Sequence, residues 1–338
     1  MIRTLIRAEV VFRRQCAHAR VILGARRRVS TLAVLAAMCL FAAVWWLEGC
    51  SQGSTRAQSE SPPLAYIGSW GVRGDGPGQL DDPACIATDS VGNVYIADGG
   101  SHFVSKFDPG GTPLLSYQDE KLKQPQSIAV DAGGAIYVTD SSRQSAFVYF
   151  PNGDRYHQLR LSVRPGREDT LSIAVDDDGM IYILDDGAGR VFNYTPRFRL
   201  LRTWQPAANA LDGKARAESL AAGPDGYLYL ADPGGNRILR FTREGRFVDA
   251  VKASADGTER RLSGQFAASR KYLFVMDADG RLLHVWSADG RPQMDLDLAP
   301  ELGQGHRPAP ALAVSPRQEL LVLDAPGARV LRYRIQLP

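Results

Sequence analysis

The feature that most constrains the fold of this chain is a repeat. The stretch NVYIADGG at 93–100 has five further copies, each a short apolar run that ends in an aspartate. A shorter run such as SIAVD (127–131) precedes every copy with the same period. The six aspartates lie 42 to 47 residues apart and are Asp98, Asp140, Asp185, Asp232, Asp277 and Asp324. A period of this length indicates one small structural unit built six times and packed against its neighbours.

Each unit holds four runs typical of β-strands. In the fourth unit they are 219–222, 227–231, 237–241 and 247–251, separated by GPDG, DPGGN and REG. Glycine and asparagine suit such hairpin turns because they adopt positive φ at little cost. No apolar pattern of helical period and useful length follows residue 64. The repeat therefore predicts an all-β fold, a six-bladed β-propeller, whose small, apolar first strands line a central channel.

The ends of the chain predict how this ring closes. The sixth unit offers three strands, at 311–314, 320–323 and 329–335, before the chain stops. A strand-like run, LAYIGSW (64–70), stands before the first unit. We expect this N-terminal strand to complete the last blade, because a gap in the ring would expose unpaired strand edges. The propeller then occupies residues 64–338.

Two stretches resemble the NHL-repeat family of six-bladed propellers. They are IGSWGVRGDGPGQLDDPACIATDSVGNVYIADGGSHFVSKFDPGG (67–111) and GYLYLADPGGNRILRFTREG (226–245). The fifth and sixth units depart from the pattern, since they lack the acid that ends the first strand and the glycine-asparagine hairpin. The resemblance implies the fold, but it implies no single function, because such propellers serve as binding platforms, scaffolds and a few enzymes.

The N-terminal segment differs from the rest in charge. It holds eight arginines before residue 50, against Glu9 and Glu48. Arginines at 26–28 precede 17 residues without charge, TLAVLAAMCLFAAVWWL (31–47). A basic flank before such an apolar run is typical of a hydrophobic signal or anchor helix, which places the residues that follow outside the cytoplasm. Residues 1–49 are therefore interpreted as a basic segment with a signal or anchor.

The residues after the apolar run predict how the protein is held. LEGCS (47–51) resembles the bacterial lipoprotein cleavage box, in which the cysteine, here Cys50, is lipidated. Glu48 departs from the small or apolar residue usual in that box. The prediction is a membrane-anchored lipoprotein of the cell envelope, periplasmic or on the outer surface, with 50–63 as a flexible polar tether. An uncleaved transmembrane anchor and a soluble secreted protein are the alternatives.

The composition of the body restricts its partners and its covalent links. The whole chain carries a formal charge of +3, but without the N-terminal segment it has 32 basic and 35 acidic side chains, a net of −3. That charge gives no electrostatic reason to expect a nucleic acid as partner. Only Cys85 lies in the body, so an intramolecular disulfide is excluded there.

The repeated acids and the histidines were the first candidates for chemistry. An aspartate that ends a strand in all six units is interpreted as a turn cap, because a catalytic carboxylate is needed once or twice. His102, His157, His284 and His306 lack the short spacings of a zinc site. The stretches DDDG (176–179) and DADG (277–280) do not continue into a calcium-loop pattern and are interpreted as polar turns. We therefore predict no catalytic residue, no metal and no cofactor.

One face of the expected propeller is the candidate ligand face. Turns between the second and third strands project from the same face as the loops between blades, and functional loops often sit on such rigid scaffolds. Solvated arginines paired with nearby acids are the alternative interpretation. The residues expected on this face are His102, Arg143, Arg190, Asn236, Arg237, Arg281, His306 and Arg329.

These expectations favour a binding function over catalysis. The predicted function is a non-catalytic binding or scaffold module that presents one face to a protein, peptide or glycan outside the cytoplasm. The alternative is a propeller enzyme of the lyase or lactonase type, with a metal site over the central channel. Related propeller enzymes use histidines on channel-facing strands, and none of the histidines of the body lies on a first strand.

Overall fold

The computed structural model describes residues 64–161, 170–209, 215–252, 261–302 and 309–336. The predicted signal, the lipid site Cys50, the tether and the candidate His306 lie outside these residues. Within the described ranges, no helix has both the length and the apolar character needed to cross a membrane. All statements below concern the described ranges.

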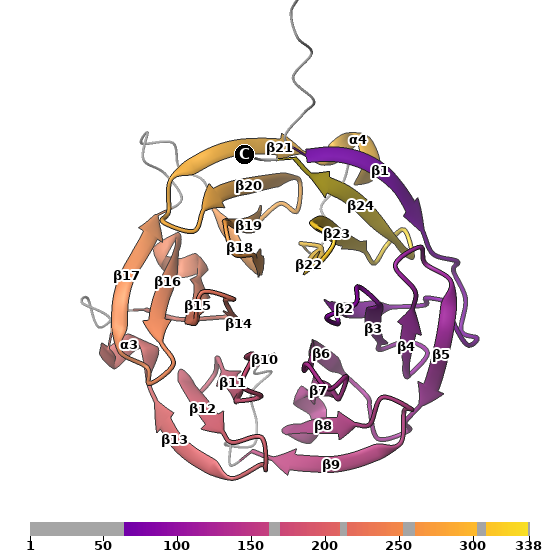
Figure 1. The fold of residues 1–338 in the computed structure, drawn as a ribbon, viewed down its shortest axis with the longest axis horizontal. Coiled ribbons are helices and arrows are strands. Elements are labelled where there is room, and N and C mark those ends of the chain that lie inside the picture. Colours follow the sequence, from indigo (N-terminus) through magenta and orange to yellow (C-terminus); the bar gives the residue numbers. More distant parts are fainter. Residues whose placement is uncertain (1–63, 162–169, 210–214, 253–260, 303–308, 337–338) are drawn as a thin grey trace, which may run out of the picture. The chain divides into compact units, whose positions relative to one another are not determined.

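The described chain forms six antiparallel four-stranded sheets around a central axis, which confirms the all-β six-bladed propeller (Figure 1). Each sheet is one blade, and its strands run in sequence order from the axis to the rim in the first five blades. The first blade contains β2 (Pro83–Thr88), β3 (Val94–Asp98), β4 (Phe103–Phe107) and β5 (Pro113–Gln118). The second contains β6 (Pro125–Val130), β7 (Ile136–Asp140), β8 (Ser145–Tyr149) and β9 (Arg155–Arg160). The third contains β10 (Leu171–Val175), β11 (Ile181–Asp185), β12 (Arg190–Tyr194) and β13 (Leu200–Trp204).

The remaining blades follow the same order with one exception. The fourth contains β14 (Ser219–Ala222), β15 (Tyr227–Asp232), β16 (Arg237–Thr242) and β17 (Phe247–Lys252). The fifth contains β18 (Leu262–Ala268), β19 (Tyr272–Asp277), β20 (Leu282–Ser287) and β21 (Pro292–Asp297). The sixth contains β22 (Ala311–Ser315), β23 (Glu319–Asp324), β24 (Arg329–Ile335) and β1 (Leu64–Trp70). Short helical turns are η1 (Ser141–Arg143), α3 (Pro206–Asn209), η2 (Pro233–Gly235) and α4 (Ala299–Leu302).

Strand β1 pairs antiparallel with β24 at the rim of the sixth blade. The register runs from Leu64 opposite Ile335 to Trp70 opposite Val330, with an irregularity between Tyr66 and Gly68. The two ends of the described chain therefore lie in one sheet, as Figure 1 shows for β1 and β24.

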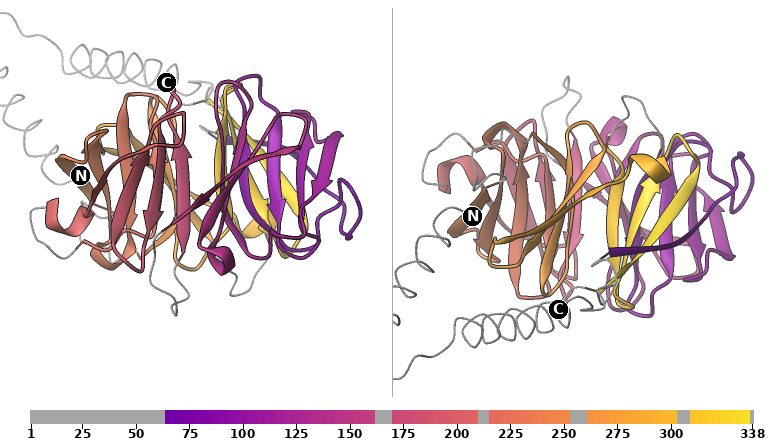
Figure 2. Two further views of the ribbon diagram at one scale, coloured as in Figure 1. Left: turned by 90° about the horizontal axis from the view of Figure 1, so that it is seen from below. Right: turned by 90° about the horizontal axis from the view of Figure 1, so that it is seen from above.

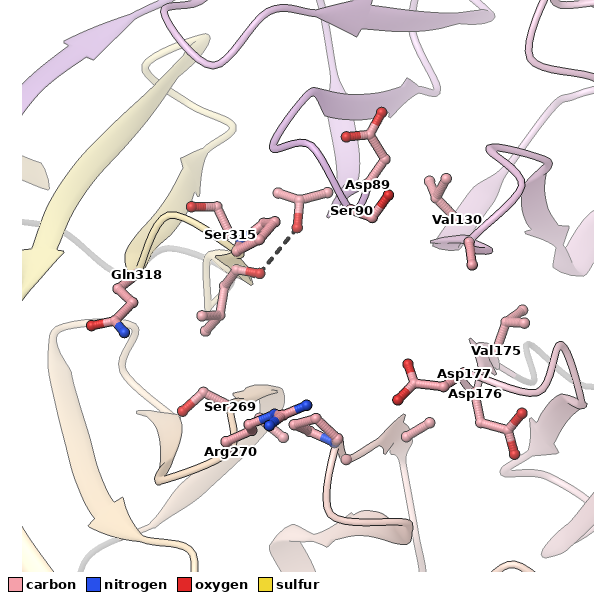
Figure 3. Close-up of a pocket in the computed structure, with 18 of the residues that line it drawn as sticks. Asp89, Ser90, Val130, Val175, Asp176, Asp177, Ser269, Arg270, Ser315 and Gln318 are labelled. Carbon is pink, nitrogen blue, oxygen red and sulfur yellow. Dashed lines mark hydrogen bonds between the residues drawn. The ribbon is translucent and has the colours of Figure 1, made fainter.

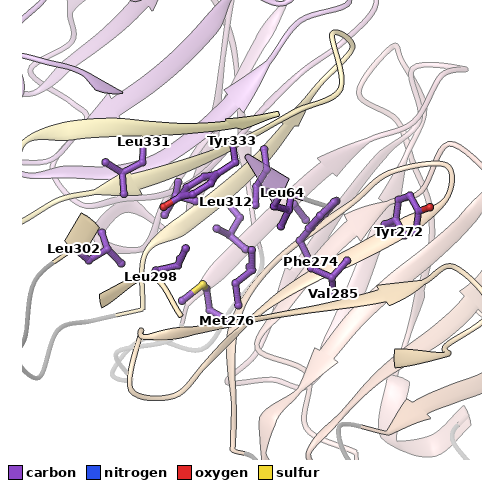
Figure 4. Close-up of a cluster of buried hydrophobic side chains, with 14 residues drawn as sticks. Leu64, Tyr272, Phe274, Met276, Val285, Leu298, Leu302, Leu312, Leu331 and Tyr333 are labelled. Carbon is purple, nitrogen blue, oxygen red and sulfur yellow. The ribbon is translucent and has the colours of Figure 1, made fainter. Parts of the chain in front are cut away.

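Apolar side chains pack between neighbouring blades rather than in one central core. The cluster in Figure 4 joins the fifth and sixth blades and contains Phe274, Val285, Leu312 and Leu331, all buried. Leu64 of β1 belongs to the same cluster. Successive strand residues face opposite sides of a sheet, so alternate residues of each blade pack on the preceding and the following blade.

The turn between the third and fourth strands adds a contact between blades. In the first blade it contains Gly111 (φ 95°), and a Cβ at that position would lie 2.2 Å from Cγ of Trp70 in the sixth blade. Only glycine fits there, because the indole of the preceding blade fills the space and the backbone is left-handed. The third blade has Phe198 (φ 62°) in its corresponding turn, and the ring stacks on His157 of the second blade with 4.4 Å between ring centroids.

The turns gather at two opposite faces of the ring (Figure 2). We call one the link face: it carries the turns between second and third strands and the connections between blades. The other is the mouth face, which carries the turns between first and second strands and between third and fourth strands. These two faces position different sets of polar residues.

Candidate functional site

A cavity of about 670 Å³ opens at the mouth face, over the central channel. The end of the first strand and the turn after it line this cavity in all six blades (Figure 3). Its lining is mixed. Small apolar residues from the ends of the first strands, such as Val130, Val175 and Ala268, alternate with polar and charged residues of the turns. A concave space that combines apolar surface with polar groups is the usual form of a ligand site.

Below this cavity the channel is narrow, because every first strand contributes an alanine to it. The space there is about 230 Å³. At one equivalent position, all six first strands contribute an alanine to its lining: Ala87, Ala129, Ala174, Ala221, Ala267 and Ala313. This agrees with the expectation of small residues on the channel wall, where six strands converge.

Most acids at the rim of the cavity hold turns together. The Oδ1 atom of Asp176 accepts N–H bonds from Asp178 and Met180, at 3.0 and 2.9 Å, and its Oδ2 atom accepts from the Tyr182 hydroxyl at 3.0 Å. Asp131 and Tyr137 repeat this arrangement in the second blade. These carboxylates are committed to backbone and phenol donors, so they close the turn rather than offer a free acceptor.

Asp89 of the first blade makes the same contacts and adds a side-chain partner. It accepts from the N–H of Asn93 at 2.8 Å, from Nδ2 of Asn93 at 2.7 Å and from the Tyr95 hydroxyl at 3.1 Å. Burial opposes the charged form of Asp89, but these hydrogen bonds outweigh it, so its pKa lies below the ordinary value. Burial, followed by the charge of Asp89, raises the pKa of Tyr95.

The first strand is followed by an aspartate in three blades and by Gly223, Ser269 or Ser315 in the others; the next residue occupies an equivalent place in every blade and is exposed at the mouth of the cavity. Its identity changes around the ring: Ser90, Ala132, Asp177, Pro224, Arg270 and Pro316. Only two of these six positions carry a charge, and the charges are opposite.

Asp177 and Arg270 project into the cavity from the third and the fifth blades (Figure 3). Within the described residues, neither side chain has a hydrogen bond or an ion pair. Lys271 follows Arg270 and also lines the cavity, so the fifth blade contributes two cations. The mouth therefore has an acidic side and a basic side, with the uncharged Pro224 of the fourth blade between them.

On the link face, the repeated aspartates act as turn caps, which confirms that interpretation. The carboxylate of Asp98 accepts N–H bonds from Gly100 and Ser101 of its own turn, at 3.0 and 2.9 Å. It also accepts from Asp81 and Asp82 of the connection into the blade, at 2.8 and 3.1 Å. One buried carboxylate thus links the turn, through hydrogen bonds, to the connection that leads into the same blade.

Three of the predicted ligand-face arginines are engaged by acids. Nε of Arg237 donates to the buried Asp232 at 2.8 Å, and Nε of Arg329 donates to the buried Asp324 at 2.9 Å. Arg281 forms an exposed pair with Asp297, with Nε 3.1 Å from each carboxylate oxygen. These contacts agree with the alternative interpretation, in which the arginines pair with neighbouring acids.

Asn236 and His102 both occupy left-handed backbone positions, and the Asn236 side chain also binds a backbone N–H group. Oδ1 of Asn236 accepts the N–H of Leu262 in the next blade at 3.0 Å. His102, at φ 60°, occupies the residue before the third strand, a left-handed position that Asn236, at φ 51°, fills in the fourth blade. The imidazole of His102 has no histidine counterpart in the other blades, but its backbone position is part of the repeat.

The other predicted residues are placed as follows. Arg190 begins β12 opposite Asp185, and its guanidinium carbon lies 5.5 Å from the centroid of the Phe192 ring. Arg143 ends η1 on the same face. Thus the link face brings together the predicted residues that the structure describes, but none of them lines the cavity at the mouth.

The buried side chains of His284 and Cys85 lie outside the mouth cavity. Nδ1 of the buried His284 lies 2.7 Å from Oδ1 of Asp295, at the middle of the fifth blade. Burial raises the pKa of the Cys85 thiol to about 12, so it stays protonated at neutral pH. Within the described residues, no three histidine, cysteine or acidic side chains are grouped as metal ligands.

From the sequence, Asp177 was assigned only to the polar turn DDDG (176–179), and Arg270 was not among the candidates. The signal was present in the turn after each first strand, as DS, DA, DD, GP, SR and SP. The second member of that pair varies while its backbone surroundings repeat. A charge that appears once in such a series has no structural role common to the blades.

Comparisons with known proteins support the fold. No protein-family model matches the chain, and no curated protein matches it. A streptogramin B lyase structure aligns over 80% of this chain and 88% of its own, with TM-score 0.57 and 14% identity. A catalytically inactive virginiamycin B lyase from Staphylococcus aureus, solved with quinupristin, aligns over 81% and 89%, with TM-score 0.56 and 14% identity. Kuenenia stuttgartiensis hydrazine synthase aligns over 81% of this chain and all of the matched chain, with TM-score 0.55 and 14% identity. At this identity the likeness shows the six-bladed propeller alone.

Proposed function

We propose that this propeller is a non-catalytic binding module that takes a protein, peptide or glycan segment into the mouth of its central channel. The observation that carries the proposal is the cavity of about 670 Å³ with an unpaired acid and an unpaired base at its rim. The other acids of the first three turns already have donors for their carboxylate oxygens. Binding groups are thus present without the paired acid and base that catalysis requires.

The cavity variant Ser90→Trp tests this assignment. Ser90 is exposed at the mouth, so an indole there fills the opening without disturbing a buried contact. We expect it to abolish binding of ligands selected from peptide and glycan arrays with the intact chain. The matched control is Leu114→Trp, at an exposed position of β5 on the outer rim, which leaves binding unchanged. Equal binding by both variants would place the ligand elsewhere.

A lyase-type activity is the second candidate, favoured by one observation. The structures that align with this chain include two lyases, and the mouth cavity lies over the channel. Asp177 and Lys271 are the groups at the mouth that could move a proton. Mass spectrometry of a bound ligand after long incubation distinguishes the two candidates: an unchanged mass supports binding, and a product lost in Asp177→Asn supports the lyase.

The proposal includes the cell envelope as the place of action. The apolar run 31–47 and the box around Cys50 support an exported lipoprotein, tethered through 50–63, with the repeat of the body assigned to the NHL type. Replacing Cys50 by alanine in the full chain should move the protein from the membrane to the soluble fraction. Retention in the membrane would support an uncleaved anchor instead.

The proposal also gives β1 a structural role, as the strand that closes the ring. Six residue pairs join β1 to β24, and Leu64 is buried between the fifth and sixth blades. Deleting 64–70 while keeping the anchor and tether should therefore expose β24 as a sheet edge and cause aggregation. A soluble, monomeric deletion variant would show that closure does not need this strand.

A further inference from the structure

We infer that the ligand held at the channel mouth is zwitterionic: a short peptide or peptide end with a free amine at Asp177 and a free carboxylate at Arg270. This inference rests on the proposed function, since it names the ligand class for the same cavity. It begins from the pseudo-symmetry of the ring. Six equivalent turn positions surround the mouth, and they carry one acid, one base and four uncharged residues.

The two charged side chains are placed for a ligand rather than for each other. Asp177 belongs to the third blade and Arg270 to the fifth, and both project toward the cavity (Figure 3). No ion pair joins them in the part of the chain that the structure describes. A molecule with an amine and a carboxylate at opposite ends satisfies both, while a ligand with one charge leaves one of them without a partner.

Neighbouring charges at the rim are already paired or point elsewhere. Asp178 is ion-paired with Arg243 of the fourth blade, and Asp225 accepts the Tyr229 hydroxyl. The Arg317 side chain lies against Gly92 of the first blade, with Nε 3.2 Å from the position of a Cβ there. The free charges that face the cavity are therefore Asp177 on one side and Arg270, with Lys271, on the other.

The walls favour a ligand whose middle is small and apolar. Between the charged positions the cavity is lined by valine and alanine side chains, with Val175 at the end of β10 and Ala268 at the end of β18. The guanidinium of arginine suits a carboxylate because it offers parallel N–H donors. A short alanine or valine peptide with free ends combines these features.

The experiment is calorimetric titration of the intact, detergent-purified chain with tetra-alanine in four forms: free, N-acetylated, C-amidated and blocked at both ends. We expect free tetra-alanine to bind, and each blocked end to weaken binding about two- to fivefold at low salt, because each loses one exposed charge contact. Raising the salt concentration should weaken binding of the free form most.

Two variants assign the ends. In Asp177→Asn the N-acetylated and free peptides should bind equally, while amidation still weakens binding. In Arg270→Gln with Lys271→Gln, which removes both cations of the fifth blade, the reverse should hold. A charge-exchange variant, Asp177→Arg with Arg270→Asp and Lys271→Gln, should restore binding of the free peptide with the end preferences unchanged. Its recovery would show that the pair of charges, and not the fold around either residue, selects the ligand.

The outcomes that overturn the inference differ from those that overturn the proposed function. If the blocked peptide binds as tightly as the free form, or if no form binds, the zwitterion assignment is wrong. If an array ligand still binds and Ser90→Trp abolishes that binding, the mouth remains the binding site and only the ligand class is wrong. If Ser90→Trp leaves binding unaffected, both are wrong.

Discussion

The two faces of the ring use charged residues in opposite ways. On the link face, three of the predicted arginines pair with neighbouring acids, as Arg237 does with the buried Asp232. On the mouth face, the turn acids of the first three blades are also satisfied, but the next position is exposed in all six blades and its residue type varies around the ring. This contrast indicates that a residue repeated in all blades has a structural role. A charge that breaks the repeat at an exposed position is the better candidate for function.

Removing a repeated acid of the link face should have the largest effect on stability. Asp232→Ala deletes a carboxylate that is 1% exposed, and it leaves Nε of Arg237 and the N–H of Gly235 without their acceptor. We expect a loss of about 3–5 kcal/mol in the free energy of unfolding, measured by urea denaturation with tryptophan fluorescence.

The fifth blade provides a matched control for that prediction. Asp277 caps the corresponding turn through the N–H groups of Arg281 and Leu282, but it is less buried, and within the described residues no arginine side chain of its own turn pairs with it. Asp277→Ala should therefore cost about 1–2 kcal/mol. Equal losses at the two positions would contradict the assignment of the extra energy to the buried ion pair.

A smaller effect is expected from the phenols beneath the mouth face. Tyr182→Phe keeps the buried ring but removes the hydroxyl that donates to Asp176 at 3.0 Å. The loss should be about 1–2 kcal/mol, because Asp176 loses a donor in a buried place. Tyr156→Phe, at a side chain that is 54% exposed, should change the free energy of unfolding by less than about 0.5 kcal/mol.

Acid should weaken the mouth face through Asp89. Because the folded-state pKa of Asp89 lies below its ordinary value, the stabilisation is complete above the unfolded-state pKa, near 4, and is lost as pH falls through the folded-state value. Thermal unfolding between pH 6 and pH 2 measures this loss. In Asp89→Asn the midpoint should be lower at pH 6 and should fall less steeply with acid. A parallel slope in both proteins would exclude Asp89 as a contributor.

The smallest effect on stability is expected at the residues proposed to bind the ligand. Asp177→Asn and Arg270→Gln remove exposed charges that have no partner in the described chain, so each should change the free energy of unfolding by less than about 0.5 kcal/mol. The same variants should weaken peptide binding. A large loss of stability in either one would assign it to the scaffold and would remove the contrast between the two faces.

Much of the fold and little of the site could be predicted from the sequence. The period and the turn chemistry predicted the six blades, and the repeat of Asp98 predicted its capping role. His102 was a candidate because its side chain is unique, yet its left-handed backbone is shared with Asn236. A sequence pattern shows which residue types recur, but it does not show which conformation makes a position recur.

The number of blades, the positions of the six repeated aspartates of the link face and the small residues of the channel could be predicted from the sequence, because they depend on short stretches repeated with one period. The arrangement of the blades was needed to show that Asp177 and Arg270 face one cavity, and that Arg237, Arg281 and Arg329 pair with acids on the other face. The reason is geometric. Residues of different blades face the same cavity only because the ring arranges equivalent turns around one axis. The spacing of residues along the chain does not show the direction in which each side chain points.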